Sequence, residues 1–178
     1  MHRFKVKRGD ITKENVDAIV NAANEALQGG SGVDGMVHEA AGPKLLRACQ
    51  NIGGCPTGTA VITPGFNLHA KYIIHTAGPV WRGGHLREEA LLASCYRSSL
   101  QVAVDNGIKT IAFSSISTGA YSYPLRGAAR VAIKAIAEFL ATDDQLEAVT
   151  MVCFGRETTG IYESEIERYK EKHTREIG

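Results

Sequence analysis

Short apolar runs alternate with longer segments of helical periodicity, and this alternation limits the possible folds more than any other feature of the sequence. The apolar runs predict strands at residues 4–8, 17–21, 59–63, 71–76, 110–115 and 148–154. The intervening segments predict helices at residues 34–41, 43–50, 87–105, 124–140 and 157–170. Strands that alternate with helices indicate an α/β protein whose mainly parallel sheet is covered on both faces. Ligands of such proteins bind at the carboxyl ends of the strands.

The composition indicates a globular chain with a single core. Its 178 residues, of which 44% are hydrophobic and 22% charged, suit one domain over residues 1–178. A polar tail from about residue 171 is expected to fray. No apolar stretch approaches the length of a membrane span, and the first residues lack the apolar run of a signal peptide. Nothing in the sequence requires more than a monomer.

The charge balance argues against a dedicated nucleic-acid binder. The net charge is only +1, so the usual electrostatic attraction to a phosphate backbone is missing. Arg126, Arg130, Lys134 and Glu138 recur every fourth residue of the expected helix at 124–140. Such spacing favours a solvated stripe opposite an apolar face over a basic recognition surface.

The cysteine pattern favours a cytoplasmic protein without metal or disulfides. The four cysteines are scattered without CxxC spacing, at Cys49, Cys55, Cys95 and Cys153. Reduced, partly buried thiols explain this pattern better than disulfides or a zinc site. We therefore expect no structural metal in this chain.

Three loops are expected at the carboxyl edge of the sheet, at residues 9–12, 21–34 and 117–124. The second loop is rich in glycine and leads into a helix. The third loop carries Ser117, Thr118 and Gly119 and also leads into a helix. Glycine lets bare backbone N–H groups approach a ligand, and a helix start favours phosphate. Together the two loops indicate a diphosphate site. A further loop, around Trp81, is expected at the surface.

Several nucleotide-binding and hydrolytic classes lack support in the sequence. Residues 30–35 match GxGxxG, but the preceding strand ends near Asn21, too far away for the tight turn of a dinucleotide fold. The region near residue 55 also offers no acidic residue for a ribose. No Walker lysine, HExxH or GxSxG is present.

Six segments together carry a resemblance to a known family. They are GDIT at 9–12, DAIVNAAN at 17–24, GGSGVDGMVHEAAG at 29–42, CPTGTAVIT at 55–63, IIHTAGPVW at 73–81 and ISTGAYSYP at 116–124. In this order and spacing the chain resembles the macrodomains, most closely the MacroD-type branch with its bacterial O-acetyl-ADP-ribose deacetylases. The resemblance implies a three-layer α/β/α sandwich on a mixed, mainly parallel, roughly six-stranded sheet. It also implies ADP-ribose as the ligand.

The resemblance assigns roles along that ligand. It implies that Asp10 accepts a hydrogen bond from the adenine amino group, with the Ile11 backbone beside it, and that Phe154 packs on the adenine. The diphosphate would lie between Gly32 and Val33 on one side and Ser117, Thr118, Gly119, Ala120 and Tyr121 on the other. Asn24 would hold the distal ribose. Asn21 fits better as a brace for the loop backbone.

Asp34 is the residue on which catalysis would depend. From the residues alone it is well placed as a helix N-cap. The resemblance instead implies that it orients or activates water beside the distal ribose. His38 follows four residues later, so a helix places both on one face, where His38 could tune Asp34 or serve as a structural histidine.

The resemblance implies hydrolysis of an ester at the distal ribose, without metal or cofactor. The substrate would be O-acetyl-ADP-ribose, or ADP-ribose on an Asp or Glu of a partner protein. The alternatives are a reader that binds ADP-ribose without cleaving it, a phosphatase acting on ADP-ribose 1″-phosphate, and direct RNA or poly(ADP-ribose) binding. Ser31 interrupts the family's glycine run, and Ser122 replaces a glycine before Tyr123. Either serine could narrow the groove or demand a negative φ.

Overall fold

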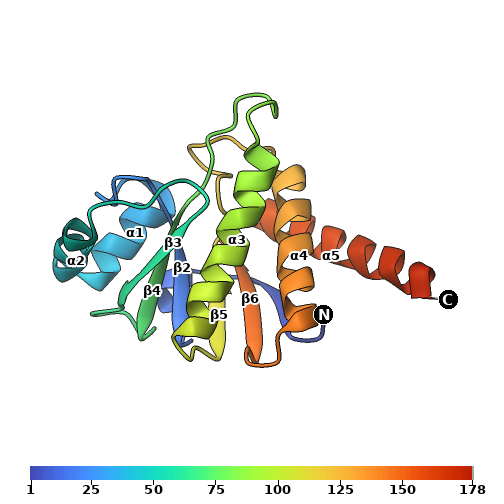
Figure 1. Ribbon diagram of the computed structural model, residues 1–178, viewed down its shortest axis with the longest axis horizontal. Coiled ribbons are helices and arrows are strands. Elements are labelled where there is room, and N and C mark those ends of the chain that lie inside the picture. Colours follow the sequence, from blue (N-terminus) through green and yellow to red (C-terminus); the bar gives the residue numbers. More distant parts are fainter. Residues whose placement is uncertain (178) are drawn as a thin grey trace.

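The computed structural model describes residues 1–177 and contains one six-stranded sheet (Figure 1). Its strands are β1 (Phe4–Arg8), β2 (Ala18–Ala23), β3 (Ala60–Pro64), β4 (Tyr72–Ala77), β5 (Thr110–Phe113) and β6 (Ala148–Cys153). They lie in the order β1-β6-β5-β2-β4-β3, and only β3 runs antiparallel to its neighbour. The predicted mixed, mainly parallel sheet is confirmed, with the first strand at one edge.

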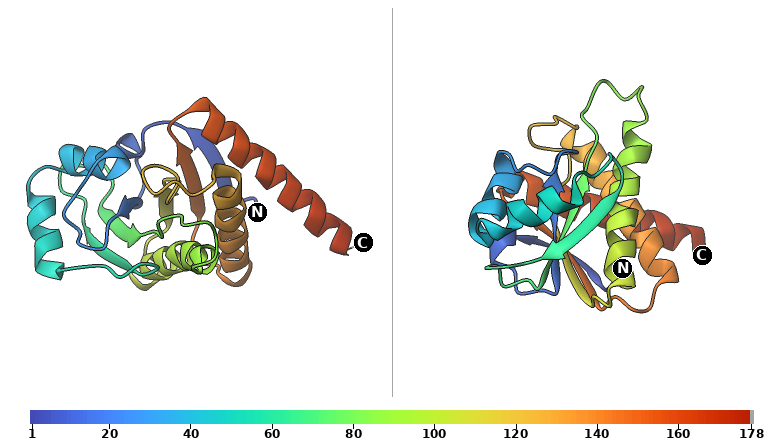
Figure 2. Two further views of the ribbon diagram at one scale, coloured as in Figure 1. Left: turned by 90° about the horizontal axis from the view of Figure 1, so that it is seen from above. Right: turned by 60° about the vertical axis from the view of Figure 1, so that its left-hand side comes forward.

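Helices cover both faces of the sheet (Figures 1 and 2). They are α1 (Gly32–Ala41), α2 (Lys44–Ile52), α3 (Glu88–Asp105), α4 (Leu125–Thr142) and α5 (Arg156–Ile177), with a 3-10 turn η1 (Ile11–Lys13) after β1. Alternate residues of β2 separate two apolar clusters, because successive side chains of a strand point to opposite faces. Ile19 packs with α1 and α2, whereas Val20 packs with α3, α4 and α5. The three-layer α/β/α arrangement is therefore confirmed.

The start of α1 differs from the sequence-based expectation. The helix begins at Gly32, and its first backbone hydrogen bond runs from the Gly35 N–H to the Ser31 carbonyl. Ser31 occupies the N-cap position, and Asp34 lies within the first turn. The prediction of Asp34 as an N-cap is wrong because its carboxylate is bonded to a strand residue instead of the helix backbone.

The last helix also extends further than expected. The predicted end near Lys170 is wrong, because α5 continues to Ile177, and only Gly178 lies outside the described residues. The expectation that the tail frays stays a prediction. Local contacts support the extra turns: the His173 ring stacks on Tyr169 at 3.9 Å, and the Thr174 hydroxyl donates to the Lys170 carbonyl. Figure 2 shows this end of α5 projecting beyond the body of the sandwich.

All four cysteines are buried and free, as predicted. Among residues 1–177, no helix combines the length and apolar character needed to cross a bilayer. Within the same residues, no group of three or more His, Cys, Asp or Glu side chains is arranged to hold a metal ion.

Candidate functional site

A cavity of about 250 Å³ opens at the carboxyl ends of β2, β4 and β5. One side is formed by the loop that leads into α1, and the other by the loop that follows β5. The predicted site residues that line it together are Asn24, Gly32, Val33, Asp34, Ser117, Gly119, Ala120 and Tyr121. The chain thus brings its two glycine-containing loops to face one another.

Asp34 is the only acidic side chain in the lining of this cavity. Only 6% of the residue is exposed, so its carboxylate needs partners inside the protein. Its Oδ1 accepts a hydrogen bond from Asn21 Nδ2 at 2.8 Å, and His38 Nε2 lies 3.4 Å from the same oxygen. The predicted placement of Asp34 and His38 on one helical face is confirmed.

The two asparagines of the NAAN segment make different contacts, and Asn24, not Asn21, braces the loop backbone. Asn21, predicted to brace the loop backbone, bonds to the side chains of Asp34 and His75. Asn24 is the residue that braces the loop: its Nδ2 donates to the Gly29 carbonyl at 2.9 Å, and its Oδ1 accepts from the Gln28 N–H. The expectation for Asn21 is wrong because its side chain lies on the face of β2 that carries the buried partners.

The loop after β5 rests on two buried tyrosines. The Tyr96 hydroxyl accepts the Ile116 N–H at 3.2 Å, and the Tyr162 hydroxyl lies 2.9 Å from Ser115 Oγ. The hydroxyl of Thr118, a residue predicted to wrap the diphosphate, donates to the Ser115 carbonyl, and Thr118 does not line the cavity. The loop is therefore held from below by side chains.

Ser117 is the polar side chain of this loop that remains available to a ligand. It is almost fully buried at the cavity and adopts φ +65°, which is unusual for a residue other than glycine. Its Oγ has no hydrogen-bond partner among the described residues. A buried hydroxyl without a partner is costly, and a ligand oxygen or water in the cavity would satisfy it.

The loop around Trp81 stands beside the loop after β5 (Figure 1). The Trp81 N–H donates to the Tyr121 carbonyl at 2.8 Å, and the Trp81 ring lies 4.7 Å from that of Tyr123. Glu88 fixes the tip of the Trp81 loop, since its carboxylate accepts three backbone N–H groups within residues 82–86. Burial raises the pKa of Glu88, but these donors outweigh it and leave the pKa below its usual value.

The residues expected around the adenine lie outside the cavity but on the same edge of the sheet. Asp10 follows β1 and accepts hydrogen bonds from the N–H and hydroxyl of Thr12, while Ile11 is buried beneath. Phe154 follows β6 and is 69% exposed. Three strand spacings separate β2 from β1, a distance of about 14 Å. An elongated ligand is needed to contact both ends of this edge.

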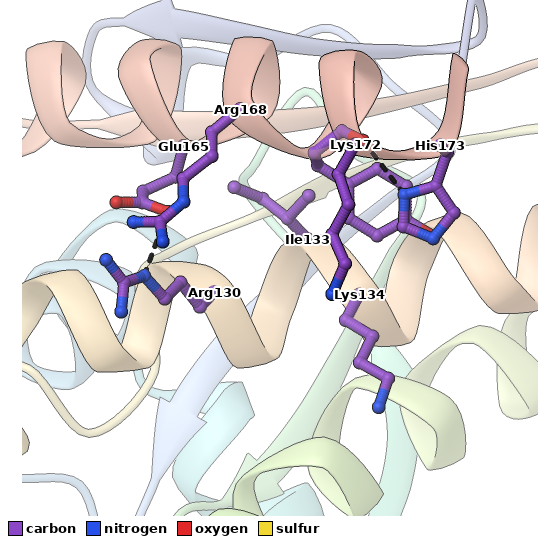
Figure 3. Close-up of a pocket in the computed structure, with 8 residues that line it drawn as sticks. Arg130, Ile133, Lys134, Glu165, Arg168, Lys172 and His173 are labelled. Atoms are coloured by element: carbon purple, nitrogen blue, oxygen red, sulfur yellow. Dashed lines mark hydrogen bonds and ion pairs between the residues drawn. The ribbon is translucent and has the colours of Figure 1, made fainter. Parts of the chain in front are cut away.

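A second hollow, between α4 and α5, is formed by basic side chains and by Glu165 (Figure 3). Arg126 and Arg130 donate to the buried Glu165 carboxylate at 2.7 and 3.0 Å. Two of the cations in the stripe expected to be solvated are therefore paired with α5. These ion pairs connect α4 with α5.

Comparison with known proteins identifies the family. The Macro domain family matches residues 20–132. A Macro domain-containing protein of Methanosarcina mazei is 56% identical over 156 residues, which cover 88% of this chain and 83% of that protein. An O-acetyl-ADP-ribose deacetylase of Citrobacter koseri is 52% identical over 165 residues, covering 90% and 93%.

A solved structure agrees with this match. The macrodomain of Oceanobacillus iheyensis, determined with ADP, is 44% identical, covers 94% of this chain and 91% of its own, and superposes with a TM-score of 0.90. The chain belongs to the Macro domain family. In this macrodomain the two glycine-containing loops and the cavity between them occupy the carboxyl edge of the sheet.

The two serines that depart from the family pattern are both accommodated in the backbone of this macrodomain. Ser31 is extended, with φ −95°, and precedes α1. Ser122 adopts φ +60°, so the expectation that it would demand a negative φ is wrong. Its N–H donates to the Gly119 carbonyl at 3.0 Å, and the N–H of the next residue, Tyr123, donates to the Ser117 carbonyl at 2.9 Å, so backbone hydrogen bonds flank the left-handed residue.

The lining residues that were not assigned a role from the sequence include Gly78, Ser115 and Ile116. Gly78 directly follows β4, in a segment that contributes to the resemblance to macrodomains. The neighbouring positions of β2, β4 and β5 in the sheet would have pointed to these residues. That order depends on long-range pairing, which the sequence pattern does not reveal.

Gly78 allows the loop after β5 to approach β4, so we predict that Gly78→Ala distorts the cavity. A Cβ at this position would lie 2.2 Å from Ser117 Oγ and 2.6 Å from a methyl carbon of Ile116. We expect the free energy of unfolding to fall by about 2 kcal/mol, the usual scale of overpacking. Denaturant unfolding checks this, with Gly160→Ala as control, since an added Cβ there meets no atom within 4 Å. Equal stability of both variants would contradict the assigned role of Gly78.

Proposed function

We propose that this macrodomain binds ADP-ribose along the carboxyl edge of its sheet and hydrolyses esters at the distal ribose. The substrates would be O-acetyl-ADP-ribose and ADP-ribose joined to an Asp or Glu of a protein. Support comes from the similarity to a relative named for the first reaction and to a macrodomain solved with ADP. The observation that carries the proposal is a buried carboxylate, Asp34, at a cavity between two phosphate-compatible loops.

The binding mode follows from the donors that the two loops offer. The backbone of residues 30–34 approaches from one side, and that of residues 115–121 from the other. The N-terminus of α1, a helix of ten residues, favours negative charge at the diphosphate. The unpartnered Ser117 hydroxyl donates to a phosphate oxygen. The adenine then reaches Asp10 and Phe154, and the distal ribose lies beside Asn24 and Asp34.

The reaction needs a positioned water and no cofactor. For the acetyl ester, water attacks the acyl carbon, the bond from that carbon to the ribose oxygen breaks, and the water's proton ends on that oxygen, giving acetate and ADP-ribose. Asp34 and Asn24 orient the water, and a diphosphate oxygen assists the proton transfer. For a protein ester, attack at the anomeric carbon is the alternative. The diphosphate contacts exist before and after reaction, so they contribute mainly to binding.

Asp34→Asn tests catalysis separately from binding. The substitution preserves volume but removes the charge that orients water, so kcat for O-acetyl-ADP-ribose should fall at least about 100-fold. The dissociation constant for ADP-ribose, measured by calorimetry, should change little. The matched control is Asp144→Asn, which should keep full activity. Asp144 is exposed and lies before β6, at the amino ends of the strands and away from the cavity. Equal, negligible release by wild type and Asp34→Asn, with binding intact, would identify a reader instead.

Phe154→Ala tests the adenine end. Because the ring is mostly exposed, its removal should leave the melting temperature unchanged. Loss of stacking on the base should weaken ADP-ribose binding by about tenfold, since such contacts contribute about 1–3 kcal/mol. Phe154→Tyr retains the aromatic face and should bind like wild type. Unchanged affinity of Phe154→Ala would place the adenine elsewhere.

A further inference from the structure

Outside the cavity, a chain of hydrogen-bonded side chains runs from β3, the last strand at one side of the sheet, to Asp34 on α1. We propose that His75 and Thr63, which do not line the cavity, are positioning residues that hold the Asp34 carboxylate in its working orientation through Asn21. The inference rests on the proposed function, because it deepens the role given there to Asp34. We refer to these side chains as the Thr63–Asp34 chain.

The strand order of the sheet makes this chain possible. Asn21 on β2 and His75 on β4 are register partners in parallel strands, so their side chains lie side by side on the same face. That face is the one covered by α1, the helix that carries Asp34. Thr63 on β3, the other neighbour of β4, supplies the outer end. Four separate elements therefore contribute one residue each.

The contacts are short and the groups are shielded from water. Asn21 Nδ2 lies 2.8 Å from Asp34 Oδ1 and 3.2 Å from His75 Nδ1. His75 Nε2 lies 3.0 Å from Thr63 Oγ1, which also lies 3.1 Å from the Pro64 carbonyl. Asn21 and His75 are completely buried, and Thr63 nearly so. Hydrogen bonds in such surroundings resist exchange with solvent and hold their geometry.

The charge state of His75 determines the direction of every hydrogen bond in the chain. Burial, together with the nearby charge of His38, lowers the pKa of His75 to about 3, so the ring is neutral and carries one N–H. Because Asn21 Nδ2 donates to Nδ1, that hydrogen sits on Nε2 and is donated to Thr63 Oγ1. The Thr63 hydroxyl in turn donates to the Pro64 carbonyl. Each donor faces an acceptor.

This arrangement leaves one buried polar atom of Asn21 without a hydrogen bond within residues 1–177. Both N–H groups of its amide are used, and its Oδ1 is buried without a partner among the described residues. Turning the amide over would place Oδ1 against the Asp34 carboxylate, where two hydrogen-bond acceptors would repel each other. His75 Nδ1, as an acceptor, opposes that turn as well. The chain thus selects one amide orientation.

The two carboxylate oxygens of Asp34 therefore have different surroundings. Oδ1 is held by Asn21 and lies near His38. Oδ2 lies on the side of Gly30, only 3.4 Å from where a Cβ on that glycine would stand, and Gly30 lines the cavity. Fixing Oδ1 leaves Oδ2 directed toward the space in which the water must be placed. Misalignment of this carboxylate would reduce turnover more than ligand binding.

Thr63→Val and Thr63→Ser form the matched test. Valine keeps the shape of threonine but removes the acceptor for His75 Nε2–H, whereas serine keeps the hydroxyl. In Thr63→Val the buried Nε2–H is left without an acceptor, so the ring is no longer held in the position in which its Nδ1 accepts from Asn21. We expect kcat for O-acetyl-ADP-ribose to fall about tenfold, with KM and the ADP-ribose dissociation constant nearly unchanged. Thr63→Ser should stay close to wild type. Equal kcat values for the two variants would overturn the proposal.

Nitrogen-15 NMR of the His75 ring provides a readout that a merely structural role would not move. In wild type the hydrogen should be on Nε2, and the ring should not titrate between pH 5 and 9, since its pKa is about 3. In Thr63→Val the hydrogen should stay on Nε2, because Nδ1 still faces the Asn21 N–H, and the Nε2 signal should shift because its acceptor is gone. A wild-type ring with its hydrogen on Nδ1, or one that titrates near the ordinary histidine pKa, would overturn the proposal whatever the activity.

The same variants separate this proposal from the proposed function. If wild type releases no acetate, the proposed function fails, and the coupling is then judged from the carboxyl carbon-13 signal of Asp34. A shift of that signal in Thr63→Val but not in Thr63→Ser would support the coupling between Thr63 and Asp34. The same signal in both variants would overturn it.

Discussion

The hydrogen bond from Asn21 to Asp34 is the contact on which the rest of the site depends. A carboxylate that is almost fully buried needs a donor, and Asp34 finds one in Asn21 on β2, with His38 of its own helix nearby. Satisfying it from β2 fixes how α1 sits on the sheet and therefore where the preceding loop runs. The loop must then pass very close to the helix, since a Cβ on Gly35 would lie 2.5 Å from the Gly30 carbonyl. Glycine at that position follows from the position of the carboxylate.

The strand order converts this local contact into an elongated site. Placing β5 beside β2 sets the loop of residues 115–121 opposite the start of α1, although the two are far apart in sequence. Placing β6 and β1 next in line carries Phe154 and Asp10 onto the same edge. The shape of the site therefore suits a long ligand with charge in its middle, which is the chemistry expected of ADP-ribose. The buried Tyr96 and Tyr162 hydroxyls keep one loop in place, and Asn24 keeps the other.

The sequence predicted the elements well, because apolar runs and turn residues report local structure directly. All six strands and five helices overlap their expected positions, and the glycines of the two loops predicted where the cavity lies. What it missed depends on contacts between distant residues. Asp34 resembled an N-cap because Asn21 becomes its hydrogen-bond partner only when α1 packs on β2. The bond of Asn21 to Asp34 was missed for the same reason. The length of α5 was underestimated because its last turns are stabilised by contacts within the helix, such as the stacking of His173 on Tyr169. The left-handed Ser122 was missed because a serine does not by itself indicate a positive φ.

The most direct test of this account is a crystal structure of the protein with ADP-ribose. The account predicts a diphosphate between residues 30–34 and 115–121, the adenine between Asp10 and Phe154, and the distal ribose within hydrogen-bonding reach of Asp34 Oδ2, while Oδ1 remains bonded to Asn21. A complex in which the distal ribose lies away from Asp34, or in which the carboxylate leaves Asn21 and turns into the helix packing, would contradict it.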